Sequence, residues 1–319
     1  MNVGISPTQW IASLGIFVIL LLAGSQDPVR LYAVSLPKPV ALPLFTVGGM
    51  RLDSDEKAPV ASLSATSVYV LTQENGEILF EHNSTTDYAP ASTTKLMTAL
   101  VVRQLYPLDR VVKIPTTRFA DDRQPLRQGQ EYSVEQLLGA LLVTSNNTAA
   151  YALADAHPNG FDGFVADMNK TARLIGLTNT NFTNPAGFDD PSHRSTARDL
   201  GQLFRAALRD PVIYHLLSSS KRTLFRPDGS AVVNMVNTHQ LLNKDPRAIA
   251  GKTGTTDEAK QVLITLLESG THPYIMVLLG SSDRYGETRR LADWVDRRYT
   301  WQIDSPSELI ELSQQVSNK

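Results

Sequence analysis

Four serine residues stand three positions ahead of a lysine, a spacing that can bring a hydroxyl and an amine together. The pairs are Ser35–Lys38, Ser54–Lys57, Ser92–Lys95 and Ser218–Lys221. Of these, Ser92–Lys95 alone runs into an amphipathic stretch, LMTALVV, which predicts a helix over residues 91–103. Residues i and i+3 face the same way on a helix, so the amine of Lys95 can reach the hydroxyl of Ser92. The pair predicts a serine nucleophile with a lysine base, although the same residues also suit a helix cap followed by a surface charge.

Two further patterns favour the chemical interpretation. They are Ser145-Asn146-Asn147, after an apolar helical run, and Lys252-Thr253-Gly254, in an expected strand, and neither pattern occurs elsewhere in the chain. Taken singly, Asn147 suits a turn and Lys252 suits a charge on an edge strand. Taken together with Ser92, they suit a serine on one wall of a cleft, a loop at its rim and a strand on the far wall.

A lysine base must lose its charge near neutral pH. A free lysine titrates near pH 10.4, so the pKa of Lys95 would have to fall by about three units. Burial disfavours the charged form of an amine, and a second cation nearby disfavours it further. Lys252 is the cation that we expect to lower the pKa of Lys95.

Composition excludes several other chemistries. The chain has no cysteine, which removes disulfides, thiolate metal sites and a cysteine nucleophile. It has no G-x-S-x-G segment, and its six histidines form no H-E-x-x-H or paired-ligand spacing. The net charge is −2 without a lysine or arginine block, so nucleic acid is not an expected partner. We expect no metal and no cofactor.

The elements that must position these residues can be predicted from periodicity and turn signals. Asn75-Gly76 predicts a hairpin between strands 67–72 and 77–80. Further helices are predicted from Ser133 (with Gln136 completing a capping box) and over 162–175, 195–208 and 288–299, and strands over 248–255, 261–268 and 273–281, with a hairpin turn at 227–229. The order predicts an α+β fold, with an antiparallel sheet built from both ends of the chain, flanked by helices and interrupted by a helical insert.

The N-terminal region has a different character from the rest. Trp10–Gly24 is an uncharged apolar run of about 22 Å as a helix, which suits an export signal or a marginal membrane anchor, and less well a buried core helix. An export signal usually has a lysine or arginine ahead of its apolar run, but no lysine or arginine precedes this one. We therefore divide the chain into an export or anchor segment at 1–25, a proline-rich linker or strand-like arm at 26–61, a catalytic domain at 62–303 and a tail at 304–319.

Three longer segments carry a resemblance to a known family. They are Tyr88–Ala99 (YAPASTTKLMTA), Asn184–Leu200 (NPAGFDDPSHRSTARDL) and Gly251–Ala259 (GKTGTTDEA). Over about residues 62 to 303 the sequence resembles the low-molecular-mass penicillin-binding proteins, the serine D-alanyl-D-alanine carboxypeptidases related to the β-lactamases. The resemblance implies a β-lactamase/transpeptidase-like fold, peptidoglycan stem peptides as substrate and β-lactam antibiotics as covalent inhibitors. It also implies a location outside the cytoplasm, with membrane association through residues 10–24 as one route.

The resemblance assigns a role to each residue of the three patterns. The site residues that it implies are Ser92, Lys95, Ser145, Asn147, Lys252, Thr253, Gly254, Thr255 and Arg284. Ser92 would be acylated while Lys95 takes its proton, and Ser145 with Asn147 would relay a proton to the leaving amine and orient the peptide. The Lys252–Thr255 strand and Arg284 would hold the substrate, its terminal carboxylate included, and backbone N–H groups of Ser92 and Thr255 would form the oxyanion hole.

Alternatives within and beyond the family remain at this point. An endopeptidase that cuts D-alanyl cross-links would use the same residues as a carboxypeptidase. A β-lactamase would need a carboxylate to activate water, and no E-x-x-x-N segment stands at the required place. A non-catalytic wall-binding module would not need all of these residues. The chain also departs from the family in carrying Lys260, a long cation, beside the third pattern.

Overall fold

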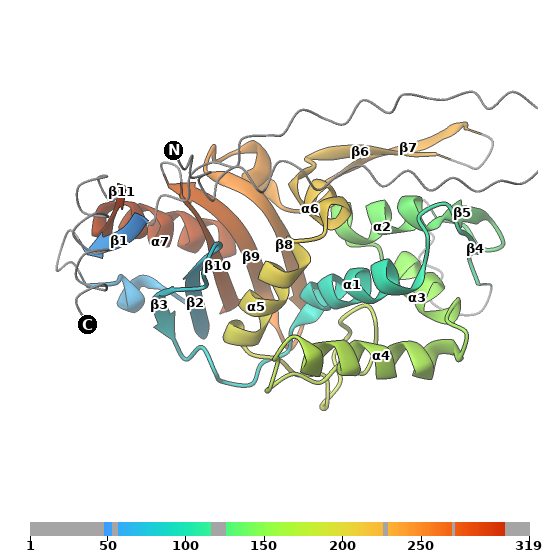
Figure 1. Ribbon diagram of the computed structural model, residues 1–319, viewed down its shortest axis with the longest axis horizontal. Coiled ribbons are helices and arrows are strands. Elements are labelled where there is room, and N and C mark those ends of the chain that lie inside the picture. Colours follow the sequence, from blue (N-terminus) through green and yellow to red (C-terminus); the bar gives the residue numbers. More distant parts are fainter. Residues whose placement is uncertain (1–47, 53–56, 116–125, 226–228, 270–271, 304–319) are drawn as a thin grey trace, which may run out of the picture. The chain divides into compact units, whose positions relative to one another are not determined.

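The sheet at the centre of the fold has five antiparallel strands in the order β3-β2-β10-β9-β8 (Figure 1). Their bounds are β2 Ser67–Thr72, β3 Ile78–His82, β8 Ala248–Thr256, β9 Lys260–Ser269 and β10 His272–Ser281. The early strand β2 pairs with the late strand β10, with Val70 opposite Met276. The predicted α+β fold, with a sheet assembled from both ends of the chain, is therefore confirmed.

The computed structural model describes residues 48–52, 57–115, 126–225, 229–269 and 272–303, and all of these belong to one compact unit. The predicted export or anchor segment 1–25, most of the arm 26–61 and the tail 304–319 lie outside the described residues, as do Pro227 and Asp228 of the predicted turn. Among the residues described, no helix is both long enough and apolar enough to cross a membrane.

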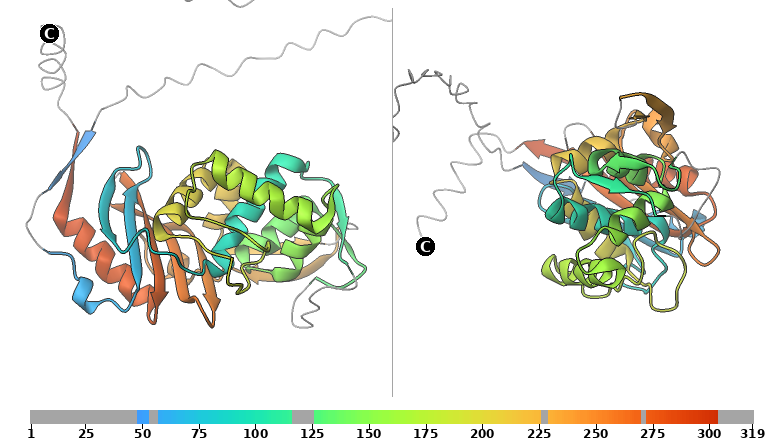
Figure 2. Two further views of the ribbon diagram at one scale, coloured as in Figure 1. Left: turned by 90° about the horizontal axis from the view of Figure 1, so that it is seen from below. Right: turned by 90° about the vertical axis from the view of Figure 1, so that its right-hand side faces the viewer.

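Each face of the sheet is covered by a separate apolar cluster, because side chains alternate along a strand. On β2, Val68 and Val70 belong to the cluster formed with helix α7, whereas Tyr69 and Leu71 belong to the larger cluster formed with the other helices. Figure 2 shows α7 on one side of the sheet and the helical insert on the other. The residues between β3 and β8 thus supply one wall of any cleft that opens at the β8 edge.

Seven α-helices lie in the described part of the chain. Their bounds are α1 Lys95–Leu105, α2 Val134–Val143, α3 Asn147–Asp155, α4 Gly160–Leu174, α5 Ala197–Ala207, α6 Pro211–Ser218 and α7 Arg284–Arg298. The predicted cap of α2 is present, since Ser133 Oγ accepts from the backbone N–H of Gln136 at 3.2 Å. Gly176 follows the end of α4 with φ +81°, as its helix-stop role predicts.

The structure corrects the prediction in four places. Residues 91–94 form a separate 3-10 turn, η3, before α1, because Ala91 has a positive φ of 48° and cannot start an α-helix. Helix α7 begins four residues earlier than predicted, where Asp283 caps it by accepting from Gly286 N at 3.0 Å. Helices α3 and α6 were not predicted.

Smaller elements surround this framework. The described part of the chain also contains three two-stranded sheets: β1 Gly48–Leu52 with β11 Tyr299–Ile303, β4 Val111–Lys113 with β5 Glu131–Ser133, and β6 Lys221–Phe225 with β7 Ala231–Val236. Short 3-10 turns lie at η2 Val60–Ser62 and η4 Gln240–Asn243. Strand β1 lies within the predicted arm. This part of the arm therefore forms a strand, which pairs with β11, the last element described.

Candidate active site

Ser92 and Lys95 meet at the junction of η3 and α1. The Lys95 amine is fully buried and lies 2.8 Å from Ser92 Oγ. It also contacts two oxygens that can only accept hydrogen bonds, Asn147 Oδ1 at 2.8 Å and the carbonyl of Ala186 at 2.6 Å. Of the other three serine–lysine pairs, Ser35–Lys38 and the residue Ser54 lie outside the described residues, and Ser218 and Lys221 belong to different elements, the end of α6 and the start of β6.

Burial holds the pKa of Lys95 well below the ordinary lysine value, and the charge of Lys252 lowers it further. The two causes are the ones that the sequence predicted. A neutral amine has two hydrogens and one lone pair. Asn147 Oδ1 and Ala186 O can take the two hydrogens, which leaves the lone pair directed at the hydroxyl of Ser92. In this protonation state the serine hydroxyl donates to the amine, which is the arrangement that a general base requires.

The turn that carries Ser92 is fixed by two glycines from distant parts of the chain. A Cβ on Gly187 would overlap the carbonyl group of Ala91 and lie 2.9 Å from Ser92 N. A Cβ on Gly254 of β8 would lie 2.9 Å from Ala91 Cβ and 3.1 Å from Ser92 N. The strand and the nucleophile turn therefore approach each other more closely than residues with side chains would permit.

The second pattern forms the link between α2 and α3. Ser145 has a positive φ of 59°, and the Asn146 side chain caps α3 by accepting from Ala149 N at 2.8 Å. This cap explains why asparagine suits the middle position. It places Asn147 at the first position of α3, beside Lys95, and leaves the Ser145 hydroxyl to accept from Lys252 Nζ at 2.8 Å.

The third pattern lies on β8, the edge strand of the sheet. Lys252 is buried, and its Nζ donates to Ser145 Oγ and to the carbonyl of Thr253 at 2.9 Å. Burial, followed by the charge of Arg284, lowers the pKa of Lys252 to about 7. The Thr253 hydroxyl shares a hydrogen bond of 2.7 Å with Thr238 Oγ1. The site therefore contains two buried amines, each joined to a serine hydroxyl.

Arg284 lies beside the C-terminal end of β8. It is the first residue of α7, and its Nη1 donates to the carbonyl of Gly254 and to Thr255 Oγ1, both at 2.9 Å. The backbone N–H of Arg284 donates to Gln261 Oε1 at 3.2 Å. A guanidinium held over a strand beside the Thr255 hydroxyl is a suitable receptor for a carboxylate.

All nine residues predicted for the site thus gather around the junction of η3, α3, β8 and α7. Ser92, Lys95 and Asn147 form one hydrogen-bonded group, and Ser145, Lys252 and Thr253 form a second. The second group continues along β8 through Gly254 and Thr255 to Arg284. The described residues contain no cluster of three or more histidine, aspartate or glutamate side chains arranged to hold a metal.

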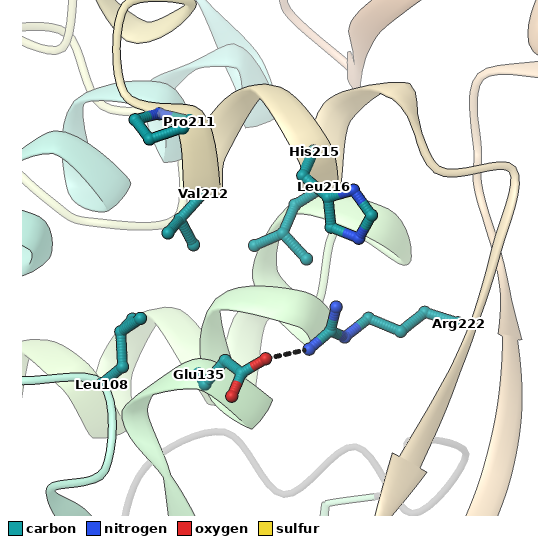
Figure 3. A pocket seen from close by; sticks show the side chains of 7 residues that line it. All are labelled: Leu108, Glu135, Pro211, Val212, His215, Leu216 and Arg222. Carbon is teal, nitrogen blue, oxygen red and sulfur yellow. Dashed lines mark hydrogen bonds and ion pairs between the residues drawn. The ribbon is translucent and has the colours of Figure 1, made fainter. Parts of the chain in front are cut away.

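A separate cavity of about 250 Å³ lies between α2 and α6 (Figure 3). Its lining residues are Leu108, Glu135, Pro211, Val212, His215, Leu216 and Arg222. Arg222 Nη2 donates to Glu135 Oε1 at 2.6 Å, so these two charged lining residues neutralise each other. None of the predicted site residues lines this cavity.

The sequence as a whole matches a known family. The sequence profile of the family described as D-alanyl-D-alanine carboxypeptidase matches residues 53–283, most of the chain. The chain belongs to this family. D-alanyl-D-alanine carboxypeptidase DacB2 of Mycobacterium tuberculosis is 30% identical over 246 residues, which cover 74% of this chain and 84% of that one.

Members of the family with different named activities are about equally similar to this chain. A D-alanyl-D-alanine endopeptidase of Pseudomonas aeruginosa is 30% identical over 78% of this chain and 83% of its own length. The crystal structure of the Streptomyces K15 DD-transpeptidase superposes with a TM-score of 0.70 at 28% identity, and covers 75% of this chain and 99% of the transpeptidase. The penicillin-binding fold implied by the sequence is therefore confirmed.

Sequence reasoning missed several residues that shape this family member's site. The carbonyl of Ala186 contacts Lys95, although backbone oxygens give no sequence signal. Thr238 bonds to Thr253, and Tyr285 OH donates to the carbonyl of Thr238 at 2.8 Å. Tyr285 directly follows Arg284, so its place beside the strand could have been inferred once α7 was known to begin there.

Proposed function

We propose that this chain is a serine D-alanyl-D-alanine carboxypeptidase that trims peptidoglycan stem pentapeptides through an acyl-enzyme on Ser92. The observation that carries the proposal is the buried Lys95 amine, 2.8 Å from Ser92 Oγ and otherwise surrounded by oxygens that only accept. Burial and the nearby charge of Lys252 hold the pKa of this amine well below the ordinary lysine value, which favours the neutral form that can take a proton. The family to which the chain belongs acts on D-alanyl-D-alanine peptides, which gives this reaction its substrate class.

The reaction begins when Ser92 Oγ attacks the carbonyl carbon of the penultimate D-alanine while Lys95 Nζ takes the hydroxyl proton. The carbonyl oxygen becomes negative and is stabilised by the backbone N–H groups of Ser92 and Thr255, each contributing about 3–4 kcal/mol. The C–N bond then breaks, and the terminal D-alanine leaves as an amine that needs a proton. Water then adds to the ester carbonyl and gives one of its protons through Ser145 to Lys252. The ester C–O bond breaks as Lys95 returns its proton to Ser92 Oγ.

Ser145 is suited to protonate the leaving amine, because its hydroxyl is held by Lys252 Nζ at 2.8 Å. The pKa of Lys252 is about 7, so near neutral pH it can replace the proton that Ser145 gives up. Asn147 accepts from Lys95 and orients the peptide next to the nucleophile. During acylation a proton thus passes from Lys252 through Ser145 to the leaving amine, while Lys95 receives the proton of Ser92.

The β8 edge supplies the binding surface. Strand β8 is at the edge of the sheet, so a peptide can pair along it at Gly254, beside Ser92. Its terminal carboxylate would reach the hydroxyls of Thr253 and Thr255 and the guanidinium of Arg284, which already bonds to Thr255. A D-configured C-terminal residue with a free carboxylate is the ligand that this arrangement favours.

The decisive experiment is incubation with a defined pentapeptide and with cross-linked muropeptide dimers, followed by mass spectrometry of the products. Release of one D-alanine from the pentapeptide supports the carboxypeptidase. Ser92→Ala is the control, and it should neither release D-alanine nor bind labelled penicillin covalently. Turnover of the pentapeptide by Ser92→Ala would refute the assignment of the nucleophile.

An endopeptidase is the second candidate, because a relative named D-alanyl-D-alanine endopeptidase is as similar to this chain as a named carboxypeptidase. The chemistry at Ser92 would be identical. The leaving amine would then belong to the side chain of a neighbouring stem peptide. Monomers released from cross-linked dimers in the same incubation would favour this activity.

We further propose that the enzyme acts outside the cytoplasm, where peptidoglycan lies. The apolar run Trp10–Gly24 would export the chain or attach it to the membrane. Fractionation of cells that express the full chain, or a form without residues 1–25, tests this proposal. The shortened form should remain in the cytoplasm.

A further inference from the structure

The segment of residues 181–195 is attached to the nucleophile turn and helix α1 at three points. The bonds run from Lys95 Nζ to Ala186 O at 2.6 Å, from Thr98 Oγ1 to Pro185 O at 2.7 Å, and between His193 Nε2 and Thr94 Oγ1 at 2.8 Å. The first bond holds the base itself. The bond of His193 holds the residue immediately before the base, from a position almost one hundred residues away in sequence.

The direction of the His193 bond follows from its other ring nitrogen. Nδ1 lies 3.0 Å from the backbone nitrogen of Thr183, whose N–H can only donate. Nδ1 is therefore an acceptor, and the proton of the neutral ring is on Nε2. Burial lowers the pKa of His193 to about 4, so the ring is neutral at pH 7. His193 Nε2–H consequently donates to Thr94 Oγ1, and both partners are buried.

The turn needs such a tie because its own backbone is strained. Ala91 has a positive φ of 48°, a conformation that L-residues adopt only when their surroundings hold them there. Thr94 is the last residue of this turn, and Lys95 follows it directly. Without the hydroxyl of Thr94 or the imidazole of His193, a buried polar group would also lose its partner.

We propose that His193 is a positioning residue for acylation, which acts through Thr94 to hold the amine of Lys95 against the hydroxyl of Ser92. The inference rests on the proposed roles of Ser92 and Lys95. In this role the imidazole of His193 does not contact the substrate. Losing the bond should therefore slow the covalent step while the affinity for the ligand stays unchanged.

Matched substitutions at both partners test the proposal. Thr94→Val removes the hydroxyl with little change of shape, and Thr94→Ser retains it. His193→Asn keeps an acceptor for the N–H of Thr183 but does not reach Thr94, whereas His193→Gln can restore a donor near Nε2. We expect Thr94→Val and His193→Asn each to slow acylation by labelled penicillin about 10–100-fold, the range for misplaced reacting groups. Thr94→Ser and His193→Gln should stay within about threefold of the wild type.

The double variant His193→Asn/Thr94→Val should acylate no more slowly than the slower single variant, because both remove one interaction. Thr180→Val is the structural control. Thr180, the residue just before this segment, bonds through Oγ1 to Ser195 Oγ within it at 2.8 Å, and this bond does not involve the nucleophile turn. The Thr180→Val variant should have a lower Tm than the wild type, and its rate of acylation should stay within about twofold of the wild type.

Two outcomes would overturn the inference: Thr94→Val acylating as fast as Thr94→Ser, or effects of the two substitutions that multiply in the double variant. If His193→Asn does not fold, the Thr94 pair decides alone. Failure of the proposed function would look different, because Ser92→Ala would then retain covalent labelling whatever happens at His193.

Discussion

Gly187 is the position where adding one methyl group should disable the site. Its φ is +86°, and it lies against the backbone of the turn that carries Ser92. The Cβ of an alanine would overlap the carbonyl group of Ala91 and lie 2.9 Å from Ser92 N. These neighbours are backbone atoms, so they cannot rotate out of the way as a flexible side chain would.

Two costs can be separated for Gly187→Ala. An L-residue at this positive φ costs about 1–2 kcal/mol of folding free energy. The steric overlap is additional and must be relieved by moving the turn by about 1 Å, since packed backbone has little room to yield. A displacement of that size between reacting groups costs about 100-fold in rate, or about 2.7 kcal/mol of activation free energy.

Gly176→Ala is the matched control. Gly176 has nearly the same φ, +81°, but a Cβ there would have no neighbour within 4 Å. It should lose the same 1–2 kcal/mol of stability, a fall in Tm of about 2–8 °C, and acylate at the wild-type rate. The difference between the two variants isolates the effect of moving the turn.

The assay is the rate of covalent labelling by a fluorescent penicillin, measured beside thermal unfolding of the same samples. Gly187→Ala should label at least about 100-fold more slowly than Gly176→Ala. If Gly187→Ala folds and labels within about threefold of Gly176→Ala, the turn does not depend on this close approach. The close packing of Gly187 would then not be what positions Ser92.

Three other outcomes are expected. Lys252→Met removes a positive charge near Lys95, so the pKa of Lys95 should rise and the acid limb of the pH profile of acylation should move to higher pH; an unmoved limb would contradict the electrostatic pairing. Lys260→Gly should raise Tm by about 2–8 °C in thermal melts, because Lys260 has a positive φ of 52° that glycine adopts without the 1–2 kcal/mol cost. Burial lowers the pKa of His239 to about 3, below the unfolded value near 6.5, so the unfolded chain binds the proton first and stability falls by about 1.4 kcal/mol per pH unit from pH 6.5 down to 3. Urea unfolding at several pH values should show a smaller slope for His239→Gln, and an identical slope would mean that this imidazole is not buried neutral.

Local signals were sufficient for much of the framework. The Asn75-Gly76 turn and the Ser133 cap depend on residues a few positions apart, and both are found where they were predicted. Two missed helices also had local signals. Asn146 caps α3 ahead of an alanine-rich run, and Asp210 caps α6 by accepting from Val212 N at 2.9 Å. These helices could have been predicted.

The shape of the nucleophile turn could not have been predicted in the same way. Ala91 takes a positive φ because Gly187 and Gly254 pack against it from segments about 100 and 160 residues away in sequence. Periodicity describes only neighbours along the chain, and it therefore predicted a plain helix here. The types and order of Ser92 and Lys95 were enough to identify the chemistry, but not the backbone that aligns them.

The two buried amines have a consequence for attempts to engineer this enzyme. Desolvation opposes the charged form of each, and Lys252 repels Lys95 as well, so a charge on either amine costs folding free energy that a neutral side chain of similar length would not. Selection for heat resistance alone will therefore favour variants that have lost a lysine and with it the reaction. A library screened for thermal stability should be sorted for turnover in the same round, because the two lysines that activity needs are unfavourable for stability.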